Sequence, residues 1–436
     1  MQHWADMSES ARQAVLDRGL NEIFDPQLRA AISDLIDDVR LRGDEAICDA
    51  LQAFDGIDLA PDQLRVSDDE YESASIDAAL ADAIDDAISH LRIFNESQMA
   101  NSAGWTTESE PGLIVGEKIT PITSCGLFTP SGKASYPSVT YQLAVPAIVA
   151  GVPEITVVVP PVPGGSGEID PAVIHICRTL GIRNIFRVNG PAGIAALGFG
   201  TERIDRVRKI VGPGSPAVTI AQVEMQRHGV STMMLLGPTE SLVIADDSAD
   251  PHRLAADLLI EAEHGTDSSV VLLTNSTELA ASTELALGEQ IAALPPARSD
   301  AARAALGPNG GCIIVASLDE ACEIANDYAP EHLQVAVDEQ RSDDVVSRLQ
   351  HAGEILVGQH TPFSAANFVI GCPASLPTSG FAHVSSGITA QAFLKRTAIA
   401  RADERALRRM SSSIIALADH EGFPAHAAAI RRRTAD

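Results

Sequence analysis

The chain has 436 residues, of which 45% are hydrophobic, and its formal net charge is −28 at pH 7. A chain of this length predicts about two to four domains, and its hydrophobic content supports complete cores, which excludes an intrinsically disordered protein. The strong negative charge argues against binding to nucleic-acid phosphates, which requires clustered Lys and Arg.

The location of the protein is predicted from features that the sequence lacks. No stretch approaches the ~18 uninterrupted apolar residues that a membrane-spanning helix needs. The polar start MQHWADMSESARQ has neither the basic nor the apolar region of a signal peptide. The six cysteines form no CxxC pair, which argues against a Cys-only zinc site and suits a reducing compartment. We therefore expect a cytoplasmic protein with neither membrane nor nucleic-acid partners.

The first 100 residues have the patterning of amphipathic helices. Apolar residues recur at helical spacing in Ala30–Arg40 and, after an Asp-rich turn, in Ile76–Phe94. One face of the second segment carries Ile76, Leu80, Ile84, Ile88 and Leu91. Such a face is usually an ordinary packing surface, so these helices are expected to cover a sheet.

From about residue 119, short apolar runs alternate with helical segments. The runs are rich in Val and Ile and are bounded by Gly and Pro, as in parallel strands covered on both faces. They predict strands at Glu154–Val159, Asn184–Val188, Val270–Thr274, Gly311–Ala316, Leu333–Val337 and Glu354–Val357. Helices are predicted at Ser138–Ala150, Pro171–Leu180, Ala192–Leu197 and His252–His264.

This alternation predicts an α/β fold with two Rossmann-like sheet domains and smaller helical segments at both ends. Residues 1–20 are expected to form the N-terminal helical segment and residues 383–436 the C-terminal one. Residues 21–120 with 236–382 would form the first α/β domain, and residues 121–235 the second. The early helices are expected on the sheet formed after residue 240. Ligands of open α/β sheets bind beyond the carboxyl ends of strands, so the site is expected in the loops after these runs.

The first candidate for chemistry is the pair Glu261 and His264. Residues three apart on a helix share a face, and Glu-x-x-His is a recurring ligand spacing in helical metal sites. The alternative is a histidine favoured by the helix dipole near a C-terminus, with Glu261 in solvent. Spacing alone favours that alternative.

The second candidate is the pair Glu331 and His332, which follows a proline and precedes a predicted strand. A carboxylate beside an imidazole suits acid–base chemistry, although a loop ion pair is the alternative. Loops rich in small residues at 361–367 and 376–380, and the segment 421–426 with its terminal His426, are weaker candidates. The glycine turns at 126–132 and 211–215 match neither a Rossmann fingerprint nor a P-loop.

Taken together, these segments resemble the histidinol dehydrogenase family. The resemblance covers most of the chain from about residue 120 and is weaker in the first 100 residues. The matching pieces, in the family's order, are GLFTPSG (126–132), VGPGS (211–215), GPTESLVIAD (237–246), EAEHG (261–265), YAPEHLQV (328–335), LPTSGFA (376–382) and EGFPAH (421–426).

The resemblance implies an enzyme that oxidises an amino alcohol through the aldehyde to the acid, with NAD⁺ and one bound zinc. It also implies an intertwined homodimer in which residues 383–436 contact the partner and complete its site, and a cofactor role for residues 121–235. Glu331 would activate water and His332 would accept the alcohol proton. His264 and His426 would bind zinc, and Glu421 would bind the substrate.

Two departures from the family pattern concern the metal. The family normally has Gln at the position of Glu261 and Asp at the position of Asn367. The exchange keeps one carboxylate, one amide oxygen and two histidines, so the summed ligand charge is unchanged. We therefore predict that Glu261, His264, Asn367 and His426 bind a divalent metal ion.

Other departures concern the substrate and the cofactor. The usual Asn-His before the LPT motif is Pro373 and Ala374, and the usual Ser after GP is Thr239, which keeps a hydroxyl for the substrate. A small primary alcohol other than histidinol, such as an amino, polyol or sulfonated alcohol, is therefore predicted. Three polar side chains expected at NAD⁺ are replaced by Phe128, Ala192 and Ser215, so the cofactor-binding residues are not assigned.

Two hypotheses follow. The first is a zinc- and NAD⁺-dependent alcohol dehydrogenase, because the catalytic pair and both zinc histidines are retained. The alternative is a metal-binding protein of this fold with non-redox chemistry or without dehydrogenase activity, because the nicotinamide contacts are altered.

Overall fold

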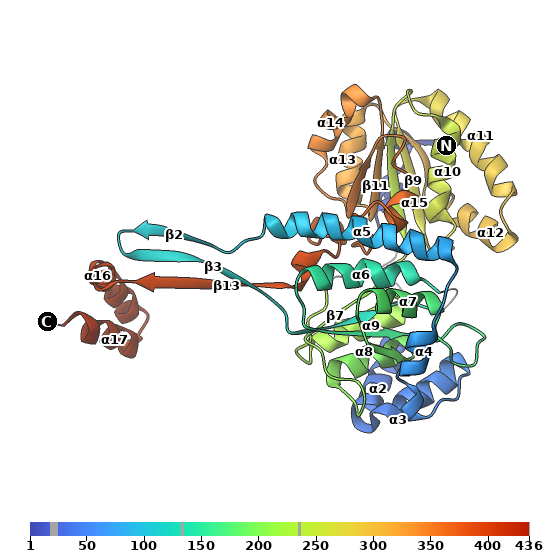
Figure 1. The fold of residues 1–436 in the computed structure, drawn as a ribbon. Coiled ribbons are helices and arrows are strands. Elements are labelled where there is room, and N and C mark those ends of the chain that lie inside the picture. The colour runs from blue at the N-terminus through green and yellow to red at the C-terminus, as the bar shows by residue number, and fades with distance from the viewer. Residues whose placement is uncertain (18–24, 132–134, 234–236, 436) are drawn as a thin grey trace.

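Two parallel sheets covered by helices and an antiparallel arm make up the molecule (Figure 1). The structure is a computed structural model, and it describes residues 1–17, 25–131, 135–233 and 237–435. The mixed α/β class with parallel sheets agrees with the sequence prediction.

The larger sheet has six parallel strands in the order β1-β10-β9-β8-β11-β12. The strands are β1 (Gln2–His3), β8 (Glu240–Ala245), β9 (Ser269–Thr274), β10 (Gly311–Ile314), β11 (His332–Ala336) and β12 (Glu354–Val357). Strands β8, β9 and β11 are buried along their whole length, because helices cover both faces of the sheet.

Two groups of helices cover this sheet, one on each face (Figure 1). One face is packed by α10 (Pro251–Ala262), α11 (Thr277–Ala292), α12 (Pro296–Ala305) and α15 (Phe363–Phe368). The other is packed by α1 (Glu9–Leu16), α13 (Leu318–Tyr328) and α14 (Glu339–Arg348). Helix α10 begins at an Asp-Pro pair, in which Asp250 accepts hydrogen bonds from two backbone N–H groups and Pro251 fits the first helical position.

The smaller sheet has four parallel strands in the order β6-β5-β4-β7. They are β4 (Ser124–Phe128), β5 (Glu154–Val159), β6 (Asn184–Arg187) and β7 (Lys209–Val211). One face packs against α2 (Pro26–Arg42), α3 (Asp44–Ala50), α8 (Gly190–Phe199) and α9 (Pro216–Gln226). The other packs against α4 (Asp68–Ser73), α6 (Pro137–Val149) and α7 (Pro171–Thr179).

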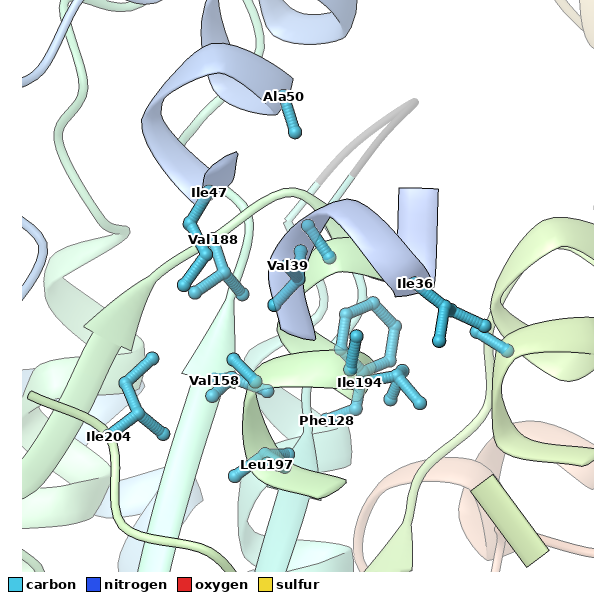
Figure 2. Close-up of a cluster of buried hydrophobic side chains, with 14 of the residues drawn as sticks. Ile36, Val39, Ile47, Ala50, Phe128, Val158, Val188, Ile194, Leu197 and Ile204 are labelled. Carbon is cyan, nitrogen blue, oxygen red and sulfur yellow. The ribbon is translucent and has the colours of Figure 1, made fainter. Parts of the chain in front are cut away.

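The early helices were expected on the sheet formed after residue 240, but they pack on the smaller sheet. Figure 2 shows Ile36 and Val39 of α2 and Ile47 of α3 beside Val158 and Ile194 in one buried cluster. The apolar face of α2 was correctly predicted, but periodicity does not say which sheet that face will meet.

Helix α5 (Ala78–Ala100) lies along α6 and joins the two sheet regions (Figure 1). Ile84, Ile88 and Leu91 are buried as its amphipathic pattern predicts, whereas Leu80 is exposed. After α5 the chain leaves the body of the molecule.

The arm is an antiparallel sheet that carries two helices at its tip (Figure 1). It consists of β2 (Trp105–Glu110), β3 (Leu113–Pro121), β13 (Leu394–Ala402), α16 (Glu404–His420) and α17 (Pro424–Thr434). Residues after 385 were expected to be helical, so β13 is a correction. Its side chains are almost all exposed, which leaves no apolar alternation to signal a strand.

The predicted elements from residue 119 to residue 357 are present, with ends that coincide or differ by at most two residues. The N-terminal segment differs more, because β1 joins the larger sheet beside β10 before the first helix begins. No helix in the described part of the chain is long and apolar enough to cross a membrane.

Candidate active site

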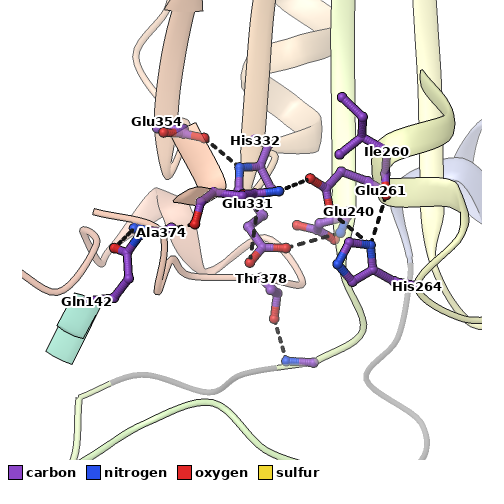
Figure 3. Close-up of polar contacts among 12 residues, drawn as sticks. Gln142, Glu240, Ile260, Glu261, His264, Glu331, His332, Glu354, Ala374 and Thr378 are labelled. Carbon is purple, nitrogen blue, oxygen red and sulfur yellow. Dashed lines mark hydrogen bonds and ion pairs between the residues drawn. The ribbon is translucent and has the colours of Figure 1, made fainter. Parts of the chain in front are cut away.

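Acidic and imidazole side chains meet at the amino edge of the larger sheet (Figure 3). Strand β8 begins at Glu240, β11 begins at His332 and β12 begins at Glu354. The predicted pair Glu331 and His332 therefore lies at the opposite edge from the one expected. The pair precedes its apolar strand instead of following it, so the rule for carboxyl ends does not apply here.

Glu331 is held close to the start of β8. Its Oε2 accepts a hydrogen bond from the backbone N–H of Glu240 at 3.2 Å, and its Oε1 lies 3.8 Å from Nε2 of His332. Two residues earlier, Ala329 ends α13 in the left-handed region with φ of 49°, which turns the chain into the strand. Unusual backbone geometry of this kind clusters at functional sites.

The environment shifts the titration of both residues upward. Burial raises the pKa of Glu331 to about 8, and the negative charges of Glu261 and Glu240 add to this against the opposing effect of His332. Burial alone would lower the pKa of His332, but Glu261, Glu331 and Glu354 outweigh it and raise that pKa to about 10. A carboxyl group with a pKa near neutrality suits general acid–base catalysis.

The predicted metal ligands Glu261, His264 and Asn367 lie together beside this pair. The Nδ2 of Asn367 donates to Oε1 of Glu261 at 2.7 Å, and Nδ1 of His264 lies 3.3 Å from Oε2 of Glu261. Helix α10 ends before His264, yet the three-residue spacing still brings the two side chains together. Glu261 is buried, whereas the His264 side chain is 45% exposed. Carboxylate, imidazole and amide groups are donors that zinc accepts.

The fourth predicted ligand, His426, and the predicted substrate residue Glu421 are elsewhere in this chain. Both are exposed at the tip of the arm, where the ring of His426 packs against Phe423. Figure 1 shows α16 and α17 far from the larger sheet. Accordingly, the residues that the structure describes contain no group of three His, Cys, Asp or Glu side chains that could hold a metal ion.

Gln142 of α6 connects the metal ligands with the predicted substrate loop. Its Nε2 donates to the carbonyl of Asn367 at 3.2 Å, and its Oε1 accepts from the N–H of Ala374 at 3.0 Å. Thr239, the other predicted substrate residue, immediately precedes Glu240 and is partly buried. Thr239 and Ala374 therefore belong to segments that reach the amino edge of the larger sheet.

The cofactor region predicted at the glycine turns is tightly packed. Phe128 is buried, and its ring lies beside Gly190 and Gly214, where an added Cβ would meet Val218 first and the ring at 3.4 and 3.1 Å. Ala192 is also buried inside α8, whereas Ser215 is exposed at the start of α9. Neither Phe128 nor Ala192 is available to contact a ligand from solvent.

Three residues of the site were not predicted, namely Gln142, Glu240 and Glu354. Glu240 is buried and accepts from the N–H of Ser379 at 3.0 Å, and Glu354 is buried against His332. Each of these glutamates is the first residue of an apolar strand, and a charged residue at that position is the signal that could have identified it. Gln142 lies inside an apolar helix without such a signal.

Comparison with known proteins identifies the family of the chain. The sequence profile of the histidinol dehydrogenase family matches residues 21–434. A histidinol dehydrogenase from Synechocystis is 38% identical to this chain, and the match covers 93% of each of the two chains. A histidinol dehydrogenase homolog from Colwellia psychrerythraea is 35% identical over 98% of this chain and 94% of its own.

The fold is also shared with a solved structure. The crystal structure of histidinol dehydrogenase from Elizabethkingia anophelis superposes with a TM-score of 0.92 at 31% identity, covering 99% of this chain and 98% of the other. The chain therefore belongs to the histidinol dehydrogenase family of oxidoreductases.

Proposed function

We propose that this protein is a zinc- and NAD⁺-dependent dehydrogenase that oxidises a small primary alcohol through the aldehyde to the acid. The observation that carries this proposal is the placement of a buried acid–base pair, Glu331 and His332, beside a group of metal donors. The charge of Glu261 affects the pKa of both members of the pair, so the two groups are within electrostatic reach of each other.

The side chains present fit a zinc ion. Glu261, His264 and Asn367 offer one carboxylate, one imidazole and one amide oxygen, and His426 of a second copy would complete the set. When bound, zinc would polarise the substrate oxygen, and NAD⁺ would accept a hydride in each of the two oxidations.

The residues of the chain would perform the proton transfers. His332, in its neutral form, would accept the hydroxyl proton of the alcohol at Nε2, which lies on the side of Glu331. Glu261 is the strongest of the charges that raise the pKa of His332, and a metal ion bound by Glu261 would offset that charge and make the neutral form available. Glu331, in its ionised form, would then take a proton from the water that attacks the aldehyde. With a pKa of about 8 this form predominates only above about pH 8, so the step should be faster at alkaline pH. The buried surroundings keep other water away from both residues.

The charge of the site favours an amino alcohol as substrate. In the described part of the chain, every ion pair formed by Glu261, Glu331 and Glu354 is with a histidine. A cationic substrate would therefore meet favourable potential, whereas a sulfonate would be repelled. Initial rates of NAD⁺ reduction with L-histidinol, other amino alcohols, an uncharged polyol and a sulfonated alcohol test this order. Fast turnover of the sulfonated alcohol alone would contradict it.

The arm supports a homodimer with shared sites. His426 and Glu421 lie at its tip, where Leu417 and Phe423 are also exposed, and a second copy offers a surface for them. Mixing two inactive variants, His426→Ala and Glu331→Gln, tests this directly. In a shared-site dimer the mixture regains activity, because one site of each heterodimer has both native residues. No recovery after exchange of subunits would refute the shared site.

A second candidate function is metal binding without redox chemistry, and the burial of Phe128 favours it. Calorimetric titration of the zinc-loaded protein with NAD⁺ distinguishes the two. Binding at or below millimolar concentration supports the dehydrogenase, and its absence supports the alternative.

A further inference from the structure

Glu354 is the neighbour of His332 across the edge of the larger sheet. In the parallel pairing of β11 with β12 the Cα of His332 is opposite that of Glu354, so both side chains leave the sheet on the same face. The backbone fixes this register, because the N–H of Glu354 donates to the carbonyl of Glu331 at 3.1 Å. A side chain at Gly353 would come within 2.4 Å of the same carbonyl, so the two strand starts are in close contact.

The contact between the two side chains is short and buried. Nδ1 of His332 lies 2.6 Å from Oε1 of Glu354, and the two side chains are only 4% and 5% exposed. An ionised carboxylate accepts hydrogen bonds and cannot donate them, so the proton is on Nδ1 of the imidazole. That leaves Nε2, on the side of Glu331, as the nitrogen that takes part in proton transfer.

Two further contacts hold this arrangement. The thiol of Cys372 donates to the second oxygen of Glu354, with an Sγ–Oε2 distance of 3.2 Å. Burial raises the pKa of that thiol far above neutrality, which keeps it protonated as a donor. On the other side, the ring of Phe363 packs edge-on against the imidazole at 5.7 Å between centroids. A buried carboxylate with both oxygens bonded is a rigid support for the imidazole.

We infer that Glu354 is a positioning residue for the reaction, which fixes the tautomer and the ring orientation of His332, and that Cys372 fixes Glu354 in turn. The inference rests on the proposed function, because the role of His332 does. A carboxylate behind an imidazole has the same effect on catalytic histidines in other enzymes, where its loss slows the chemical step.

The kinetic test uses the zinc-loaded protein with NAD⁺ and its best alcohol. Glu354→Gln should lower kcat by about 100-fold or more with little change in KM, because substrate binding does not involve this residue. Glu354→Asp, which keeps the carboxylate, should recover part of the loss. Ser241→Ala is the matched control, because Ser241 is the buried neighbour of His332 on the other side, in β8, and should leave kcat unchanged. A kcat of Glu354→Gln within about threefold of the native value would overturn the inference.

A second measurement needs neither a variant nor a substrate. NMR of the native protein with ¹⁵N-labelled histidine should show His332 protonated at Nδ1, with that proton shifted strongly downfield by its hydrogen bond. A proton found only on Nε2 would overturn the inference even if the enzyme is active. If no alcohol in the panel is oxidised, the proposed function fails, while the NMR result still decides whether Glu354 fixes the imidazole.

Discussion

The pairing of Glu261 with Asn367 makes a quantitative prediction about metal affinity. In Glu261→Gln the donor set loses its carboxylate, although an amide at 261 can still face Asn367. Outer hydrogen bonds to metal ligands are worth about 10–100-fold in affinity, so loss of the carboxylate ligand itself should weaken zinc binding by at least about 100-fold, or about 2.7 kcal/mol. Asn367→Asp alone places two carboxylates at the present 2.7 Å contact, which should destabilise the metal-free protein by like-charge repulsion.

The double variant, Glu261→Gln with Asn367→Asp, is the decisive case. It again has one carboxylate and one amide, joined by a hydrogen bond of reversed direction, and should bind zinc within about tenfold of the native protein. Competition with a chromophoric chelator measures the affinity of all four proteins, and thermal unfolding of the metal-free forms checks that each is folded. Native affinity in Glu261→Gln, or a double variant no better than that single variant, would refute the reasoning.

Three other predictions concern stability. The pKa of His332 is raised from 6.5 to about 10 and that of Glu331 from 4.5 to about 8. Both groups therefore bind protons more tightly in the folded state than in the unfolded state. The metal-free protein should lose stability as the pH rises from about 4.5 to about 10. Urea unfolding across this pH range measures the loss of stability. Glu331→Gln should reduce the part of the loss that occurs between about pH 4.5 and 8. A stability of the native protein that does not change with pH would contradict the raised pKa values. Phe128→Tyr should cost about 1–3 kcal/mol in denaturant unfolding, because the added hydroxyl enters a packed space beside the glycine turns; no loss would mean that it finds a partner. Gly371→Ala should cost more than the about 1–2 kcal/mol of left-handed strain, since its Cβ would lie 2.6 Å from the backbone of α5. Gly56→Ala is the control, because Gly56 also has a positive φ but has open space around it. Equal losses in the two variants would show that the contact at Gly371 is relieved.

The sequence predicted the elements that have a local apolar pattern. The strand at Glu154–Val159 and the helix at Pro171–Thr179 were predicted nearly residue for residue, because the strand is a continuous apolar run and the helix has one apolar face. The arm was missed for the opposite reason. Every residue of β2 is exposed, and β3 finds its other partner, β13, about 280 residues later in the chain, which no local window can detect.

The site was predicted in part for a similar reason. Glu331 adjoins His332 in the sequence, and Glu261 shares a helical face with His264. Spacing therefore marked both pairs as candidates, and the family resemblance gave them their predicted roles. The bond between His332 and Glu354 depends on the register of two strands, and the bridge from Gln142 depends on contact between the two sheet regions. Only the folded arrangement reveals such long-range partners.

Glu240 and Glu354 are the first residues of their strands, and this limits which changes of sequence the active site can tolerate in evolution. Successive side chains of a strand point to opposite faces, so a slip of one residue in β12 would turn Glu354 to the face away from His332 and put an apolar neighbour in its place. Insertions before β8, β11 or β12 would therefore disrupt the chemistry, whereas the loops at the opposite edge of the sheet can change length without moving it. New substrate preferences should thus arise by point substitution at the amino edge, as at Ala374, and length variation among relatives should accumulate at the carboxyl edge.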